Sequence, residues 1–382
     1  MSKVELVIVL AAGEGTRMKS KSAKVLHEIA GRTIIENLLA AVKPLEAKNL
    51  TVVVGSHKDE VIEHLSKIAP KAKTVFQEKR NGTGGAAQLA LASHKGDGTV
   101  LILAGDTPLL TTQTLQEFID LHASQKNKAS VLTALLPDPT GYGRIIRGDD
   151  GAILKIVEEK DAADSEKDID EINTGVYLFE SKALSAVISK IQSNNSQKEL
   201  YLTDVISLLN DQKDFAHAIL SNDYTETLGI NDRTQLAECA AIMRDRINNQ
   251  HMLAGVSIID PTTTWIDAGV KIEADVVIYP SSSISGESVI KSGAIIGPRT
   301  TLVDCEVGSD ASVIESFATK SKIGAGAKVG PYTYLRKGTV LDSDSKAGAF
   351  VEIKNSTGGS PFLCWGCANR AREQYRRSYS IC

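Results

Sequence analysis

A loop with two glycines directly follows the first apolar run of this chain. It spans residues 10–17 and has the sequence LAAGEGTR. Small residues and glycines allow a backbone to approach a phosphate closely, and successive N–H groups then form a nest for an anion. Arg17 adds a forked positive charge that suits phosphate oxygens. The loop has no Walker pattern, and Met18 stands at the third glycine position of a dinucleotide fingerprint. A phosphate site and a plain strand-to-helix turn therefore both remain open.

A carboxylate at the end of a second apolar run is the next candidate. Asp106 follows Thr99–Ala104, and ligands of open α/β sheets bind beyond the carboxyl ends of the strands. Asp106 could instead cap the turn into Pro108. Lys24 and Asn231 also have plain alternatives, as a solvated charge and as the N-cap of a helix.

A sheet must position these side chains, and residues 1–231 alternate strand-like and helix-like segments. Runs rich in Val, Ile and Leu are typical of buried parallel strands, and they occur at Glu5–Ala11, Leu50–Val54, Lys73–Phe76, Thr99–Ala104 and Ala129–Leu135. Helical patterns lie between them, at Thr33–Val42, Asp59–Ile68, Gly84–Ser93 and Thr114–His122. Thr114 and Glu117 have the spacing of a capping box. The alternation predicts a doubly wound α/β domain.

An apolar residue recurs at every sixth position in the second half of the chain. The series is Ile266, Ile272, Ile278, Ile284, Ile290, Ile296 and Leu302, and after a slip it returns as Ile323, Val329, Leu335 and Leu341. Neither a helix nor a flat strand has this period. It predicts a left-handed parallel β-helix of hexapeptide repeats, in which each coil buries its apolar face on the next. An ordinary β-sandwich is the alternative.

The same patterns divide the chain into four regions. Residues 1–231 form the α/β domain, and residues 232–250 form a connecting helix, because Arg233–Asn249 has helical periodicity without Gly or Pro. Residues 251–355 form a partial β-helix. Residues 356–382 have no hexads and a composition foreign to the rest, so we expect a disordered tail. Its Cys364-x-x-Cys367 fills at most half of a zinc site.

Composition excludes several classes of function. The chain has 382 residues, 42% of them hydrophobic and 24% charged, which suits two domains with separate cores. A net charge of −4 gives no indication of a nucleic acid or a membrane surface as partner. The longest apolar run, Leu6–Ala12, is too short to span a bilayer. The 5 cysteines are an odd number without a disulfide framework, so we expect a cytoplasmic protein.

Further motifs follow one another in the first half of the chain. They are LAAGEGTRM at 10–18, SAKVL at 22–26, QE-x-x-x-GTG at 77–84, GDTP at 105–108, DPTGYGRI at 138–145, IVE at 156–158, EINTG at 171–175 and GINDR at 229–233. The combination resembles the sugar-nucleotide pyrophosphorylases. The closest likeness is to the bacterial bifunctional enzymes with N-acetylglucosamine-1-phosphate uridylyltransferase and glucosamine-1-phosphate acetyltransferase activities. It covers about residues 4–355.

This resemblance implies a role for each motif. Arg17 and Lys24 are the implied catalytic residues. The resemblance assigns contacts with the uracil and the phosphates to Leu10, Ala11, Ala12, Gly13, Lys24, Gln77, Gly82 and Thr83. It assigns contacts with the sugar to Gly143, Glu158, Asn173 and also Tyr142. Asp106 and Asn231 would hold Mg²⁺, with Asn231 also at the substrate. From the residues alone, Glu158 could equally be a surface ion-pair partner and Asn173 a turn residue.

The implied reaction joins UTP to N-acetylglucosamine-1-phosphate. A sugar-phosphate oxygen attacks the α-phosphorus of UTP and pyrophosphate leaves, which needs no general base because the nucleophile is already an anion. Mg²⁺ takes few protein oxygens and keeps waters or phosphates as its other ligands, so one carboxylate and one amide oxygen suit it. An ADP- or dTDP-glucose pyrophosphorylase is the second possibility, and a non-catalytic regulatory subunit of the same fold is the third.

The family pattern is incomplete in the coils. Arg336 and Lys354 match the family's contacts to glucosamine-1-phosphate, the acetyl acceptor. Acetyl transfer from acetyl-CoA depends in the family on a histidine base further along the coils, but no histidine follows His251 here. We therefore expect no acetyltransferase activity from this chain. Members of the family are homotrimers through their coils.

Overall fold

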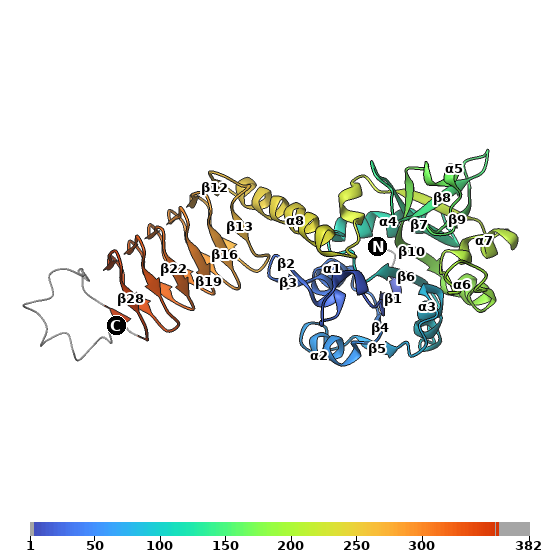
Figure 1. The fold of residues 1–382 in the computed structure, drawn as a ribbon, viewed down its shortest axis with the longest axis horizontal. Coiled ribbons are helices and arrows are strands. Elements are labelled where there is room, and N and C mark those ends of the chain that lie inside the picture. The colour runs from blue at the N-terminus through green and yellow to red at the C-terminus, as the bar shows by residue number, and fades with distance from the viewer. Residues whose placement is uncertain (1–3, 356, 359–382) are drawn as a thin grey trace, which may run out of the picture. The chain divides into compact units, whose positions relative to one another are not determined.

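The computed structural model describes residues 4–355 and 357–358, and its internal contacts divide the chain into two compact units (Figure 1). Among the described residues, the first unit holds 4–28 and 33–239, and the second holds 29–32 and those from 240 onward. Their boundary falls inside α8 (Arg233–Leu253). The predicted domain limits at residues 231 and 250 stay a proposal. No helix in the described part of the chain is both long and apolar enough to cross a membrane.

The first unit is built on one mixed sheet. Its main path is β11 (Ala216–Leu220), β7 (Ala129–Leu135), β10 (Glu171–Glu180), β6 (Thr99–Ala104), β1 (Val4–Ala11), β4 (Asn49–Val54) and β5 (Lys73–Phe76). The last four strands pair in parallel, as their uninterrupted apolar sequences predict. β10 runs antiparallel to both β6 and β7, which the sequence did not indicate. The hairpin of β8 (Gly143–Arg147) and β9 (Ile153–Val157) extends from β10.

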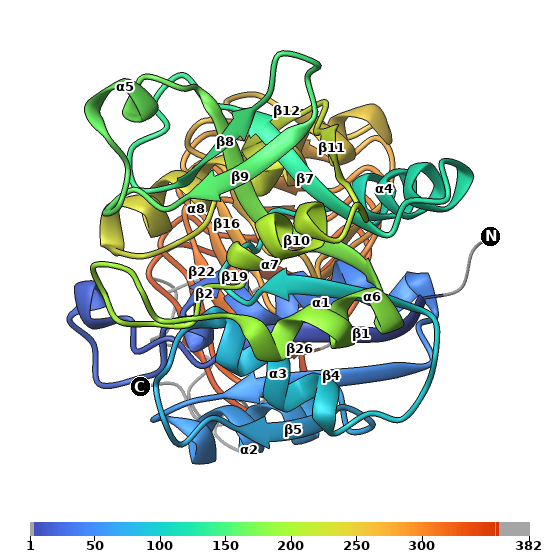
Figure 2. The same ribbon diagram turned by 90° about the vertical axis from the view of Figure 1, so that its right-hand side faces the viewer.

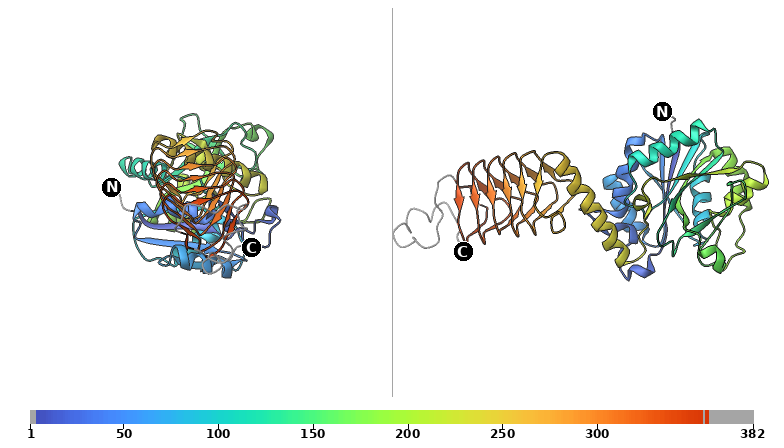
Figure 3. Two further views of the ribbon diagram at one scale, coloured as in Figure 1. Left: turned by 90° about the vertical axis from the view of Figure 1, so that its left-hand side faces the viewer. Right: turned by 90° about the horizontal axis from the view of Figure 1, so that it is seen from above.

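Helices cover both faces of this sheet (Figures 2 and 3). One apolar cluster joins the sheet to α1 (Ile34–Val42), α2 (Lys58–Ile68) and α4 (Thr112–Ser124). The other joins it to α3 (Thr83–Ala92), α6 (Ser181–Val187) and α7 (Asp204–Asp211). In β1, Val7 and Val9 belong to the first cluster, whereas Leu6 and Ile8 belong to the second. The strands are thus buried on both sides, and the doubly wound architecture is confirmed. The first unit also contains the short helix α5 (Asp164–Lys167), and the division between the units passes through the short strands β2 (Glu28–Ile29) and β3 (Arg32–Thr33).

The start of α4 differs from the prediction. The N-cap is Thr111, whose hydroxyl accepts a hydrogen bond from the Thr114 amide at 3.2 Å. The same hydroxyl donates to Glu226 at 2.9 Å. The predicted capping box at Thr114 and Glu117 is wrong, because this tertiary contact favours the earlier threonine as the cap.

The second unit is a left-handed parallel β-helix with three sheets of six short strands (Figure 3). The first sheet holds β12 (Ser257–Ile258), β15 (Val277–Ile278), β18 (Ile295–Ile296), β21 (Ser312–Val313), β24 (Lys328–Val329) and β27 (Lys346–Ala347). The second holds β13 (Trp265–Ile266), β16 (Ser283–Ser285), β19 (Thr301–Val303), β22 (Phe317–Thr319), β25 (Tyr334–Leu335) and β28 (Glu352–Ile353). The third holds β14 (Lys271–Ile272), β17 (Val289–Ile290), β20 (Glu306–Val307), β23 (Lys322–Ile323), β26 (Val340–Leu341) and β29 (Thr357–Gly358).

The slip in the hexapeptide pattern is a set of shorter turns, and the stack is continuous through it. Val307, Val313 and Ala318 are fully buried there and continue the inward-facing series. Val307 follows Leu302 at a spacing of five residues, so a search for a strict period of six misses it. β29 also extends the third sheet past residue 355, the predicted end of the coils. The other residues of the predicted tail, 356 and 359–382, lie outside the described residues.

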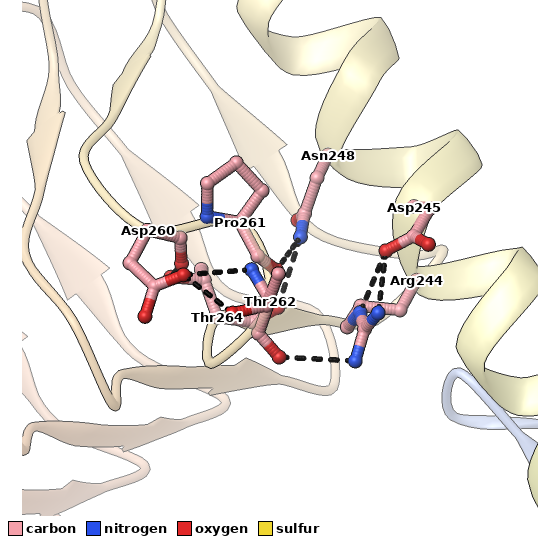
Figure 4. A network of polar contacts seen from close by, with 7 residues as sticks. All are labelled: Arg244, Asp245, Asn248, Asp260, Pro261, Thr262 and Thr264. Carbon is pink, nitrogen blue, oxygen red and sulfur yellow. Dashed lines mark hydrogen bonds and ion pairs between the residues drawn. The ribbon is translucent and has the colours of Figure 1, made fainter.

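The second half of α8 closes the first coil. Asn248 is fully buried and donates to the carbonyl oxygens of Pro261 and Thr264, both at 2.9 Å (Figure 4). Arg244 donates to the Thr262 carbonyl at 3.0 Å, and its guanidinium lies 5.0 Å from the centre of the Trp265 ring. A stack of repeats needs a cap on its first coil, and this helix provides it with hydrogen bonds to the backbone.

Candidate active site

The predicted nucleotide and sugar residues gather around one cavity of about 480 Å³ in the first unit. The cavity lies beyond the carboxyl ends of β1, β5 and β6, the edge at which ligands of open α/β sheets bind. The predicted residues that line it are Leu10, Ala11, Ala12, Gly13, Arg17, Lys24, Gln77, Gly82, Thr83, Asp106, Glu158, Asn173 and Asn231.

The glycine loop forms one wall of the cavity. Gly15 has a φ of 62°, and a Cβ atom on it would lie 2.7 Å from Cβ of Lys24. Glycine is therefore required there both by the backbone conformation and by the packing of the Lys24 stem. A Cβ atom on Gly13 would meet no atom within 4 Å, so its backbone faces open space where a phosphate could approach. Arg17 is exposed beside it, in the short 3₁₀ turn Thr16–Met18.

Lys24 lies between the two predicted metal ligands. Its ammonium forms an ion pair with the Asp106 carboxylate and donates to the Asn231 amide oxygen at 3.2 Å. Asp106 follows β6, and its backbone carbonyl accepts a hydrogen bond from the Ile230 amide at 2.9 Å. The side chains of Lys24 and Asp106 are 11% and 23% exposed, so the pair is only partly screened by water.

This arrangement fits a divalent metal. The carboxylate of Asp106 and the amide oxygen of Asn231 converge on one cationic atom, which shows that both can face the same positive centre. In the described part of the chain, no group of three or more His, Cys, Asp or Glu side chains could hold a metal ion. A site with few protein ligands suits Mg²⁺, which takes its other oxygens from water and phosphates.

The loop after β5 and the start of α3 form the next wall. Gln77 is buried and donates to the side chain of Asn81 at 2.8 Å and to the Gly82 carbonyl at 3.0 Å. A Cβ atom on Gly82, which has a φ of 92°, would lie 2.5 Å from the carbonyl oxygen of Leu200. Only glycine fits at that position. The side-chain amide and the start of α3 are thus held rigidly against the cavity.

Two polar side chains from the β9 and β10 part of the sheet also line the cavity. Glu158 follows β9 and accepts a hydrogen bond from the Thr203 hydroxyl at 3.3 Å. Burial raises the pKa of Glu158, although the Thr203 bond partly opposes the rise. Asn173 on β10 donates to the Tyr177 hydroxyl at 2.7 Å and accepts from the Gly175 amide at 3.2 Å. Both ends of the Asn173 amide are therefore fixed.

Comparisons with known proteins agree with this architecture. Residues 7–148 match the family of MobA-like NTP transferase domains. Proteins named bifunctional protein GlmU from Streptomyces coelicolor and Streptomyces avermitilis are 46% and 45% identical to this chain over 356 residues. These alignments cover 92% of this chain and 74% of each relative. The chain belongs to the GlmU family.

Other GlmU relatives and one solved structure extend the comparison. The GlmU protein of Mycobacterium bovis is 44% identical over 360 residues, or 93% of this chain and 73% of that protein. A crystal structure of a proposed glucose-1-phosphate thymidylyltransferase from Bacillus anthracis, in complex with a sucrose, superposes with a TM-score of 0.51. It covers 63% of this chain and 96% of its own at 20% identity, which supports the fold of the nucleotidyltransferase unit.

Besides Tyr142, three of the residues expected from the GlmU resemblance lie outside this cavity. Gly143 starts β8 and pairs with Asn173 in register, but is not among the described residues that line the cavity. Arg336 and Lys354 belong to the second unit and follow the paired strands β25 and β28. The Arg336 guanidinium forms an ion pair with Glu352 at 2.9 Å. The roles of all three stay predictions.

Several lining residues were missed by motif reasoning. Thr203 and Tyr177 hold the carboxylate and the amide at the predicted sugar end, yet neither stands at a matched motif position. Glu14 and Arg80 form an ion pair that joins the glycine loop to the loop after β5. Glu14 lies in the glycine-loop motif, whereas Arg80 occupies a variable position of QE-x-x-x-GTG, and nothing in the sequence indicates that the two are partners.

The raised pKa of Glu158 predicts a pH-dependent stability. The folded protein binds this proton more tightly than the unfolded chain, so the ionised carboxylate destabilises the fold at pH values above its ordinary pKa of 4.5. We expect Glu158→Gln to unfold at a higher temperature than the wild type at pH 7. The difference should disappear below about pH 4.5, where the carboxyl is protonated in both states.

Glu166→Gln is the matched control for this measurement. Hydrogen bonds from the Ala163 amide and from Lys155 lower the pKa of Glu166, so its ionised form favours the fold. Its replacement should lower the unfolding temperature at pH 7, opposite in sign to Glu158→Gln. The test is the unfolding temperature of both variants and the wild type, measured between pH 4 and 8. A Glu158→Gln variant whose unfolding temperature equals that of the wild type at every pH would contradict the prediction.

Proposed function

We propose that this chain transfers a uridylyl group from UTP to N-acetylglucosamine-1-phosphate with Mg²⁺, giving UDP-N-acetylglucosamine and pyrophosphate. The observation that carries the proposal is the contact of Lys24 with both Asp106 and Asn231 at the edge of the glycine loop. A cationic side chain, a carboxylate and an amide oxygen at one point are what a metal-bound triphosphate needs. A non-catalytic subunit would have no reason to keep them together.

Different residues of the cavity have different roles in this reaction. Backbone N–H groups of the glycine loop, together with Arg17 and Lys24, bind the phosphates and neutralise the charge that grows on the leaving pyrophosphate. Gln77 and the start of α3 orient the base, and Glu158 and Asn173 orient the sugar phosphate. Bound Mg²⁺ would supply further charge neutralisation as a Lewis acid held by Asp106 and Asn231.

Bond making and breaking occur at the α-phosphorus of UTP. An oxygen of the sugar phosphate forms the new P–O bond, and the bond from the α-phosphorus to the bridging oxygen of pyrophosphate breaks. The attacking oxygen is already an anion, so no side chain must remove a proton. Catalysis then consists of holding the two substrates in line and offsetting their mutual charge repulsion.

For the coils we propose that this chain does not acetylate glucosamine-1-phosphate. Arg336 and Lys354 could contact the acceptor sugar. A free amine nucleophile must lose a proton, however, and no histidine that could accept it follows His251. Arg336 and Lys354 belong to a different unit from the proposed nucleotide site, so we expect uridylyl transfer not to depend on them.

Substrate selection is tested by pyrophosphate release. The purified chain is assayed with UTP, dTTP, ATP and CTP against N-acetylglucosamine-1-phosphate, glucosamine-1-phosphate and glucose-1-phosphate. We expect turnover only with UTP and N-acetylglucosamine-1-phosphate, and none without a divalent ion. Preference for dTTP or ATP with glucose-1-phosphate would favour the second kind of pyrophosphorylase. Release of thiol from acetyl-CoA, measured on the same preparation, would refute the proposal for the coils.

A further inference from the structure

The segment that carries Asn231 is held by three successive backbone amides. The amides of residues 229–231 donate in turn to the Tyr142 hydroxyl at 3.1 Å, the Asp106 carbonyl at 2.9 Å and the Gln235 side chain at 2.7 Å. The three acceptors come from three different parts of the unit. The middle bond ties Ile230, which directly precedes Asn231, to the backbone of Asp106, and the two side-chain bonds fix the segment on either side of it.

Tyr142 is itself fixed from two directions. Its ring packs on the small apolar cluster of Ala134, Leu136 and Ile172, beside Leu228. Its carbonyl accepts a hydrogen bond from the guanidinium of Arg144. The hydroxyl oxygen consequently has a defined place next to the Gly229 amide.

The surroundings of Arg144 reinforce this anchor. Arg144 is 1% exposed and forms an ion pair with Glu159 at 2.8 Å. Burial raises the pKa of Tyr142, so the neutral phenol accepts the bond from Gly229 over the whole physiological range. Tyr142 is not among the described residues that line the cavity, and the role of a sugar contact does not suit a hydroxyl turned toward the backbone.

We infer that Tyr142 is a positioning residue for the metal-binding amide of Asn231. It acts through Gly229, because the bond to its hydroxyl fixes the segment from which the Asn231 oxygen reaches the site of Lys24 and Asp106. Without this anchor the oxygen is no longer held at the distance that a small cation with strict geometry requires. The inference rests on the proposed function, since it assigns the metal to Asp106 and Asn231.

The test is Tyr142→Phe, which removes one oxygen and keeps the ring in the apolar cluster. Loss of a hydrogen bond to a buried amide predicts that the Mg²⁺ concentration for half-maximal turnover rises on the order of ten-fold. The value of kcat at saturating Mg²⁺ should change by no more than about two-fold, because excess metal restores occupancy. The KM for the sugar phosphate should not change.

Two readouts besides activity accompany this assay. Mn²⁺ serves as the probe ion, titrated by electron paramagnetic resonance with a UTP analogue whose α,β-bridging oxygen is a methylene. Its affinity should fall by the same factor as the Mg²⁺ requirement rises. Hydrogen exchange of the peptide that contains residues 229–231 should become faster, because the Gly229 amide loses its hydrogen-bond acceptor.

Tyr177→Phe is the matched control, because it also removes one hydrogen-bonded tyrosine hydroxyl from the same unit. Its partner is the Asn173 amide at 2.7 Å, so we expect a higher KM for the sugar phosphate with an unchanged Mg²⁺ requirement. Opposite patterns from the two variants cannot come from a general loosening of the unit. Equal effects of both variants on both parameters would overturn the inference.

A second variant keeps the inference falsifiable should Tyr142→Phe fold poorly. Gln235→Met removes the acceptor of the Asn231 amide and should also weaken Mn²⁺ binding and speed exchange of residues 229–231. Unchanged Mn²⁺ affinity and exchange in either folded variant would refute the positioning role. A wild-type protein that releases no pyrophosphate with any nucleotide would instead contradict the proposed function, and the exchange measurement would still report on the anchor.

Discussion

Asp106→Ala is expected to lower kcat roughly 10²–10³-fold at saturating Mg²⁺. Lewis-acid stabilisation of a phosphoryl transition state is worth several kcal/mol, and each ~1.36 kcal/mol corresponds to a ten-fold change in rate. Asp106 is the proposed charged ligand of the metal, since Asn231 contributes a neutral oxygen. Steady-state pyrophosphate release measures the effect.

Asp106→Asn separates the charge of this side chain from its packing. The amide keeps an oxygen that can accept from Lys24, so the folded unit loses less stability than with alanine, but the negative charge that the metal needs is absent. We expect its kcat to fall nearly as far as that of Asp106→Ala, with a smaller drop in unfolding temperature. Asp149→Ala, an exposed carboxylate on the β8–β9 turn, is the control and should leave both values unchanged. Wild-type turnover by either Asp106 variant would exclude this residue as the ligand.

Strand positions could be predicted closely because each strand is a short apolar run between polar or small residues. Lys73–Phe76, Thr99–Ala104 and Ala129–Leu135 have the predicted bounds. The antiparallel β10 could not be predicted, because its sequence EINTGVYLFE gives no information about the direction of its neighbours. Strand direction is decided by the path of the chain between elements and by packing across the sheet.

The candidate site shows the same division between local and tertiary information. The glycine loop could be recognised in the sequence, because the conformation of Gly15 and its contact with Lys24 allow only glycine at that position. The pairing of Lys24 with Asp106 joins residues 82 positions apart, and only the parallel register of β1 and β6 brings their loops together. Thr203 and Tyr177 form hydrogen bonds with Glu158 and Asn173, and no spacing in the sequence marks such partners.

Lys24→Met is expected to slow catalysis but to strengthen the binding of the metal when no nucleotide is present. Methionine keeps the unbranched stem that passes Gly15 but has no charge. The value of kcat/KM for UTP should fall about 10²-fold, because a preorganised cation at the phosphates typically contributes ~2.7 kcal/mol or more to the transition state.

The affinity for Mg²⁺ alone should instead increase in Lys24→Met, since the ammonium and the metal compete for the same carboxylate and amide oxygens. Mn²⁺ titration of the nucleotide-free protein measures this step, and the unfolding temperature of the variant should rise more on addition of Mg²⁺ than that of the wild type. Lys21→Met, which changes an exposed lysine of the same segment, is the control and should change neither kcat/KM for UTP nor the affinity for the metal ion. If Lys24→Met weakened the binding of the ion together with turnover, Lys24 would not stand at the metal position, and Asp106 and Asn231 would have to bind it from another direction.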